Sequence, residues 1–164
     1  MSEALKAVPG SDKIDTGITG VTAIAKGLSD SLADTYRLLF KSHAVHWNVE
    51  GPMFHSIHVL TEAQYTDLFQ AADDLAERIR ALGRIAPFQM SEITRMSCVK
   101  DPAKLGSAQD MVEDLASDHE AVVRRMRDVI EKAEEGKDVA TADLLTARCA
   151  FHEKAAWMLR ATAK

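Results

Sequence analysis

The chain contains 164 residues and carries a formal net charge of −5. This length corresponds to one domain, which can bury a hydrophobic core without disulfides. Its only two cysteines, Cys98 and Cys149, form no CxxC motif and favour a reducing compartment over a disulfide framework. No apolar stretch reaches the roughly 18 residues of a membrane span, and the first residues lack a signal-peptide pattern. We therefore expect a soluble, cytoplasmic protein whose acidic charge disfavours non-specific binding to nucleic acid.

Apolar residues spaced three and four positions apart predict a first helix that begins near Val21 and continues into His43 and His46. The Gly-Pro dipeptide at 51–52 ends it, and a second helix follows over about 53–82. This second helix has an ordinary core stripe and a further apolar row on another side. The row consists of Tyr65, Phe69, Ala72 and Ala76. A helix that is apolar on two sides must bury both, which indicates contact with a second copy of the chain.

The remaining sequence predicts two more helices after a long connection. Residues 84–106 form that connection, which contains a short helical candidate at SEITRM. Ser107 can cap a third helix, which ends at the polar turn EEGKD, and a fourth begins at about Thr141. Strand signals are scarce. The sequence therefore predicts an all-α protein: an N-terminal tail at 1–17, then a ferritin-like four-helix bundle at 18–164 with a long crossover containing a short helix.

The second helix carries two pairs of potential metal ligands, His58/Glu62 and Asp73/Glu77. At about 1.5 Å per residue the pair centres lie roughly 22 Å apart, so one chain cannot close both pairs around a metal ion. At about 100° per residue, all four side chains fall within an arc of roughly 100° on one side of the helix. A two-fold axis near Asp67 would place the first pair of one copy against the second pair of another. The spacing predicts a metal site shared between subunits.

Each pair alone is weak evidence for a metal site. His58 and Glu62 also fit a solvated pair one helical turn apart. Asp73 and Glu77 also fit an exposed acidic face, although like charges one turn apart repel each other unless a cation offsets them. Their common face, with aromatic residues between the pairs, favours the metal interpretation. Imidazole and carboxylate together suit Fe(II), and the absence of thiolate pairs argues against structural zinc.

The first helix can supply a further ligand. His43 and His46 lie three residues apart on an apolar stripe, where hydrogen-bonded core histidines are the commoner explanation. Next to the acids of the second helix, we interpret His46 as a ligand and His43 either as structural or as a residue that supports a ligand without touching the metal. Trp47 is by default a core aromatic residue. Beside an iron oxidation site it would also be an electron donor that quenches damaging radicals.

The segment KSHAVHWNVEGPMFHSIHVLTEAQYTDLFQAADDLAERIRALG closely resembles the signature of the Dps family, the DNA-binding proteins from starved cells, which are miniature ferritins. The match covers HWN, the Gly and Phe that follow, a histidine twelve residues after the first, and DxxAER. TADLLT and a Trp-containing last helix extend it over residues 20–164. The resemblance implies a hollow dodecameric shell, a homo-oligomer that oxidises Fe(II) at dimer interfaces. It also implies that hydrogen peroxide is preferred over O2 as oxidant, and that the ferric mineral is stored inside, which protects DNA from oxidative damage.

By position, the resemblance assigns His46 and His58 as histidine ligands from one subunit, with Asp73 and Glu77 supplied by the other. Glu62 stands where the family commonly has Asp. The carboxylate is kept but is one methylene longer, which leaves open whether it binds iron directly or through water.

Asp143 in TADLLT resembles a residue of the family's acidic iron-entry pores, and Asp138 would assist it. The alternative for both is a carboxylate near a helix N-terminus that stabilises the helix dipole. Residues 1–15 hold two lysines against three acidic residues, so we expect weak or no DNA binding. Two other functions stay open: a nucleoid-binding shell protein with a vestigial metal site, and a shell that scavenges divalent metal ions without redox turnover.

Overall fold

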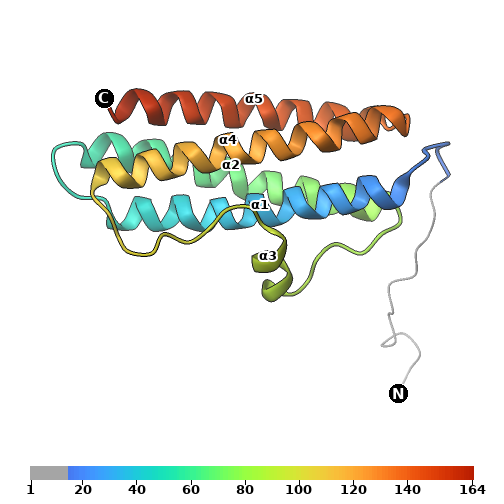
Figure 1. Cartoon of the computed structure of the whole chain (residues 1–164), viewed down its shortest axis with the longest axis horizontal. Helices are drawn as coiled ribbons and strands as arrows, with labels where there is room; N and C mark the ends of the chain where they lie inside the picture. Colours follow the sequence, from blue (N-terminus) through green and yellow to red (C-terminus); the bar gives the residue numbers. More distant parts are fainter. Residues whose placement is uncertain (1–14) are drawn as a thin grey trace, which may run out of the picture.

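The computed structural model describes residues 15–164, so the expectation about the charged tail concerns residues outside the described part. Four long helices lie antiparallel in a bundle, with α2 packed on α1 and α5 packed on α4 (Figure 1). The helices are α1 (Val21–Asn48), α2 (Phe54–Ala81), α3 (Met90–Met96), α4 (Ala108–Glu135) and α5 (Val139–Thr162). None of the described helices combines the length and apolarity that crossing a membrane requires. The predicted all-α fold, with four long helices and one short one, is confirmed.

Local capping determines where the long helices stop and start. α2 ends in a Schellman turn: Gly83 adopts a positive φ of 71°, and the backbone N–H of Arg84 donates to the carbonyl of Ile79 at 3.1 Å. α4 begins with a capping box, in which Ser107 and Asp110 each bind the other's backbone N–H. The predicted cap at Ser107 is therefore confirmed.

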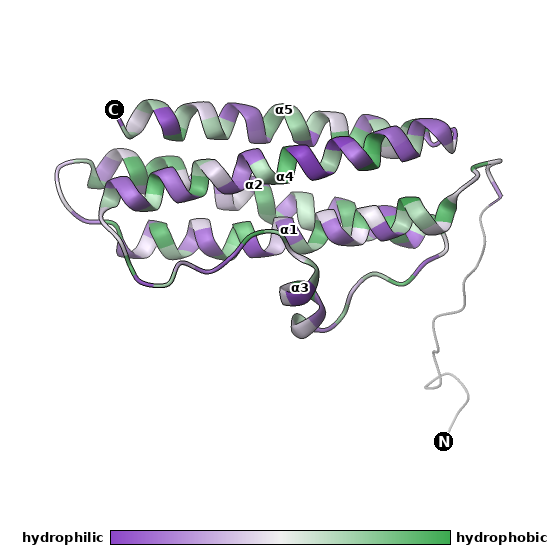
Figure 2. Cartoon of the chain, in the orientation of Figure 1, coloured by the Kyte–Doolittle hydropathy of each residue, from purple (hydrophilic) through white to green (hydrophobic). Residues whose placement is uncertain are grey.

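The core lies along the axis between the four long helices. Hydrophobic and hydrophilic residues alternate along each long helix (Figure 2), and most of the buried residues are apolar. The residues with no exposed surface include Ile24, Leu28, Leu38, Leu68, Leu75, Leu115, Met126, Leu145 and Leu159. The second apolar row on α2 is narrower than its sequence suggests, because Ala72 belongs to the core of its own chain and only Phe69 in that row is strongly exposed, at 67%.

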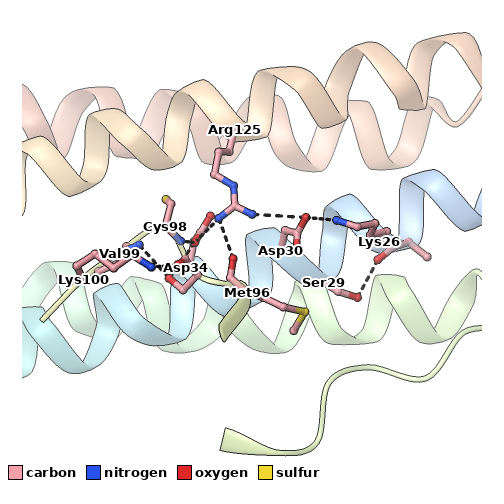
Figure 3. A network of polar contacts seen from close by, with 11 residues as sticks. Lys26, Ser29, Asp30, Asp34, Met96, Cys98, Val99, Lys100 and Arg125 are labelled. Carbon is pink, nitrogen blue, oxygen red and sulfur yellow. Dashed lines mark hydrogen bonds and ion pairs between the residues drawn. The ribbon is translucent and has the colours of Figure 1, made fainter. Parts of the chain in front are cut away.

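A polar network attaches the crossover to the bundle (Figure 3). The buried carboxylate of Asp34 on α1 accepts hydrogen bonds from the Ser97 hydroxyl at 2.9 Å, the Cys98 backbone N–H at 2.7 Å and the Arg125 guanidinium at 2.9 Å. Arg125 on α4 also donates to the carbonyl of Met96. Burial raises the pKa of Asp34, and Arg125 with the hydrogen bonds opposes that rise. The crossover, which runs the length of the bundle in Figure 1, is thereby tied to α1 and α4.

Two histidines without any evident role in the sequence meet inside the bundle. His119 on α4 and His152 on α5 are fully buried, and their Nδ1 atoms lie 2.8 Å apart. One ring must donate and the other accept, so at least one of them is neutral. Burial, with the nearby Arg148, lowers the pKa of His119 to about 3, and burial also lowers the pKa of His152. Both imidazoles are therefore neutral at pH 7.

This buried pair predicts a loss of stability in mild acid. Histidines in the unfolded chain take up protons below about pH 6.5, whereas these two do not in the folded state. The free energy of unfolding should therefore fall as pH falls from about 6.5 towards 3, by about 2 kcal/mol at pH 5 for His119. Urea unfolding at pH 7 and pH 5 measures the loss.

The matched control for this prediction is an exposed histidine. A His119→Leu/His152→Leu double variant should lose most of the difference between pH 7 and pH 5. His55→Ala, which removes an exposed imidazole, should keep it. If the double variant loses as much stability between pH 7 and pH 5 as the wild type does, the buried pair does not cause the loss of stability in acid.

Candidate metal centre

His46 and His58 face each other where α1 ends and α2 begins. Their rings stack with centroids 3.6 Å apart and planes 16° from parallel. Nδ1 of each ring lies 2.8 Å from the backbone carbonyl oxygen of the other residue. A carbonyl only accepts, so both Nδ1 atoms carry a hydrogen, and in the neutral form of each ring the lone pair is then on Nε2. This is the tautomer that a metal-binding histidine requires.

Aromatic rings surround this pair of histidines. Tyr65 meets His46 edge-on at 5.2 Å, and His43 lies between Trp47 at 4.0 Å and Tyr65 at 4.2 Å. Trp47 is 58% exposed, so the default interpretation as a core aromatic residue is wrong for this chain. His43 serves as a spacer between two aromatic rings, which agrees with a structural role.

The acidic candidates all lie on the exposed side of α2. Glu62 follows His58 by one turn, and Asp73 and Glu77 lie farther along the helix. None of the three forms an ion pair with any residue in the described part of the chain. Within residues 15–164 of one chain, no three His, Cys, Asp or Glu side chains gather closely enough to hold a metal ion. A single chain therefore presents two separate ligand sets on one helix.

Exposed apolar side chains accompany the ligands on α2. Phe69 is 67% exposed and Val59 is 49% exposed. Large exposed apolar side chains beside charged residues are typical of a surface that another chain covers. This surface contains the polar residues that a metal ion would need.

Asp138 does not fit the pore interpretation. It is the N-cap of α5, where its buried carboxylate accepts hydrogen bonds from the backbone N–H of Thr141 at 3.0 Å and its hydroxyl at 2.6 Å, and pairs with Arg78 at 2.6 Å. The helix-terminus alternative therefore applies to Asp138, and this cap starts α5 at Val139, two residues before the predicted position. Asp143 is exposed near the start of α5 and stays a candidate for the pore.

Comparisons with known proteins agree with the fold. Residues 25–164 match the family model described as a ferritin-like domain, which defines the class of protein. The chain is 41% identical over 135 residues to an uncharacterised low-temperature-induced protein of Nostoc sp., covering 81% of this chain and 75% of that protein. It is 36% identical over 134 residues to DNA protection during starvation protein 2 of Bacillus anthracis, covering 82% and 92%.

The structural comparison points to the same family. A crystal structure of a Dps protein from Vibrio cholerae O1 superposes with a TM-score of 0.86 at 27% identity, covering 93% of this chain and 97% of that one. That protein is called a member of a broad superfamily of ferritin-like diiron-carboxylate proteins. The chain belongs to the Dps family.

Proposed function

We propose that the protein is an iron-storage and detoxification protein with ferroxidase activity. It oxidises Fe(II) at sites shared between two copies of the chain, preferably with hydrogen peroxide, and keeps the ferric mineral inside a shell of twelve subunits. The main support is the reciprocal hydrogen bonding of His46 and His58, which leaves both Nε2 atoms free for Fe(II). The name of the Bacillus anthracis relative supports a role in protecting DNA, and the Vibrio cholerae relative supports iron chemistry.

Two copies of α2 running antiparallel would complete the site. His46, His58 and Glu62 of one copy would then lie opposite Asp73 and Glu77 of the other. Contact between the exposed apolar side chains of the two copies would remove them from water. A cation held between the two ligand sets would offset the repulsion between the unpaired carboxylates.

The pairing of two ferrous ions explains the protective chemistry. Two Fe(II) and one H2O2 with two protons give two Fe(III) and two water molecules, so both electrons come from iron. A single Fe(II) supplies only one electron and leaves a hydroxyl radical. The carboxylates stabilise the ferric charge that develops. Trp47, whose ring centre lies 4.0 Å from that of His43 near the site, would supply the missing electron when the second Fe(II) is absent. Exposed Asp143 would help to attract incoming Fe(II).

Mixing two inactive variants tests whether the site is shared. His46→Ala/His58→Ala removes the imidazole half, and Asp73→Ala/Glu77→Ala removes the opposite half. Each variant alone should be inactive. When the two chains carry different affinity tags and are co-expressed in equal amounts, oligomers purified on both tags contain dimers with one intact site. Random pairing should restore about a quarter of the wild-type rate of ferric absorbance increase.

The control is a mixture of the two separately assembled variants, which should stay inactive. If the doubly purified oligomers are also inactive while their helix content and size match the wild type, the ligands do not come from two chains and the proposed site is wrong.

A further inference from the structure

A layer of polar side chains lies inside the bundle, outside the candidate metal centre. It consists of the buried Gln64 on α2, His119 on α4 and His152 on α5, together with Arg148 on α5, whose side chain is 11% exposed. Six of their nitrogen and oxygen atoms are buried and have no hydrogen-bond partner in the described structure. These atoms are Gln64 Nε2 and Oε1, His119 Nε2, His152 Nε2, and Arg148 Nε and Nη2. Buried polar atoms are normally paired, so these six atoms require partners from outside the chain, either water molecules or a bound ligand.

The register of α2 against α5 places these side chains at one level. The ion pairs Asp67–Arg148 and Arg78–Asp138 join the two antiparallel helices. Gln64 precedes Asp67 by about one turn of α2, and His152 follows Arg148 by about one turn of α5. Because the two helices run antiparallel, both steps lead in the same direction, so Gln64 and His152 lie at the same level of the bundle.

Phe151 connects the members of this layer. The Arg148 Cζ atom lies 4.3 Å from the centre of its ring, and the ring centre lies 5.3 Å from that of His152. Gln64 and Asp67 line the same groove as Phe151. Phe151 is therefore the common neighbour of Arg148, of His152 and of the groove that Gln64 lines.

The guanidinium of Arg148 has one satisfied edge and one free edge. Its Nη1 donates to the Asp67 carboxylate at 2.6 Å, while Nε and Nη2 are buried without partners. Nε–H and Nη2–H point in the same direction and form a two-pronged donor. This fork matches two oxygens of a planar oxyanion such as a carboxylate.

The charges around the layer favour an anion over a metal cation. Arg148 carries the full positive charge, both histidines are neutral, and the nearest carboxylate, Asp67, already binds the other edge of Arg148. A cation here would lie beside a guanidinium without a free carboxylate to offset it. The Gln64 amide and one imidazole, by contrast, supply further N–H donors. We propose that this layer binds a small planar oxyanion of the carboxylate, bicarbonate or nitrate type, held by the Nε/Nη2 fork of Arg148.

A groove between α2 and α5 supplies a route to the layer. These two helices pack sparsely on each other, and the groove between them has a volume of about 340 Å³. Gln64, which is 97% buried, lines it together with Leu60, Phe151 and Met158, and Lys154 contributes a positive charge. A space of this size accepts a small molecule.

Formate, the smallest carboxylate, is the probe for this site. Isothermal titration of the assembled protein with sodium formate, at an ionic strength held constant with sodium chloride, should show saturable binding. Arg148→Met should weaken it at least about tenfold, because the charged fork is lost. Arg148→Lys, which keeps the charge without the fork, should weaken it similarly. Gln64→Leu should weaken it by a smaller factor.

Two controls separate this site from its surroundings. Asp67→Asn removes the carboxylate partner of Arg148 but keeps the fork, so it should bind formate at least as well as the wild type. His46→Ala/His58→Ala should bind formate normally, because the layer is separate from the candidate metal centre. Equal affinities of the wild type and both Arg148 variants would overturn the proposal. So would the absence of saturable binding of formate, bicarbonate and nitrate by the wild type, or only water at the fork in a crystal grown with formate.

Discussion

Replacing Arg125 by methionine is expected to lower the free energy of unfolding by about 3–5 kcal/mol. The substitution keeps the apolar stem but removes the cation that pairs with Asp34, a carboxylate whose side chain is only 1% exposed. It also removes the donor to the Met96 carbonyl, so the crossover loses an attachment to α4. Urea unfolding at a fixed subunit concentration measures the loss.

The nearby Arg127 provides a matched control for Arg125. It forms an ion pair with Glu153 at 2.6 Å, but both side chains are more than half exposed. Arg127→Met should therefore cost no more than about 1 kcal/mol. Adding Asp34→Asn to Arg125→Met should recover part of the loss, since no uncompensated charge stays buried. A loss below 1 kcal/mol in Arg125→Met would show that the network contributes little.

The pH dependence of the same variant follows from the pKa of Asp34. Burial raises this pKa above its ordinary value, and removal of Arg125 should raise it further. When a carboxyl group has a higher pKa in the folded state than in the unfolded state, the free energy of unfolding falls as pH rises from the unfolded-state pKa through the folded-state pKa. The difference between Arg125→Met and the wild type should therefore shrink as pH falls from 7 towards that raised pKa.

Replacing Asp73 by asparagine is expected to reduce the initial rate of Fe(II) oxidation by at least about tenfold. The amide keeps the size of the side chain but loses the negative charge that, in the proposed site, would hold Fe(II) and stabilise Fe(III). The rate of ferric absorbance increase after addition of Fe(II) and peroxide measures the effect. Anaerobic Fe(II) titration should show a matching loss of affinity.

The next residue along the helix is the control. Asp74 is also exposed, but it faces about 100° away and accepts a hydrogen bond from Gln70 at 3.0 Å. Asp74→Asn should therefore oxidise Fe(II) at close to the wild-type rate. Equal rates in the wild type and Asp73→Asn would remove Asp73 from the proposed site. Equal losses in both variants would indicate a general effect of surface charge.

The sequence predicts the helices well because their signals are local. Apolar periodicity and the cap at Ser107 place each long helix to within about two residues, and the short helix at SEITRM is present. Cys98 and Cys149 are free, as expected. The start of α5 was predicted two residues too late, although its cap is also local: the Asp138 carboxylate accepts a hydrogen bond from the backbone N–H of Thr141, three residues on.

The candidate site is predictable only in its residue types. Helix geometry places His58, Glu62, Asp73 and Glu77 on one side of α2, but no sequence pattern shows that a backbone carbonyl fixes each imidazole. The contact between His119 and His152 is equally hidden. It joins residues 33 positions apart, and it exists only because of the register of α4 against α5. Contacts of this kind are determined by packing between helices rather than by local pattern.

The crossed hydrogen bonds between His46 and His58 have an evolutionary consequence. Each ring is held by the main chain at the end of the other helix, and residues 49–53 join the two ends. The spacing of the two imidazoles therefore depends on this short hairpin loop as well as on the packing of α1 against α2, to which the buried Val49 of the loop belongs. Mutations at the exposed positions 50–53 would shift both imidazoles together while the core stays intact, so under the proposed function iron affinity and fold stability would be free to diverge among descendants of this chain.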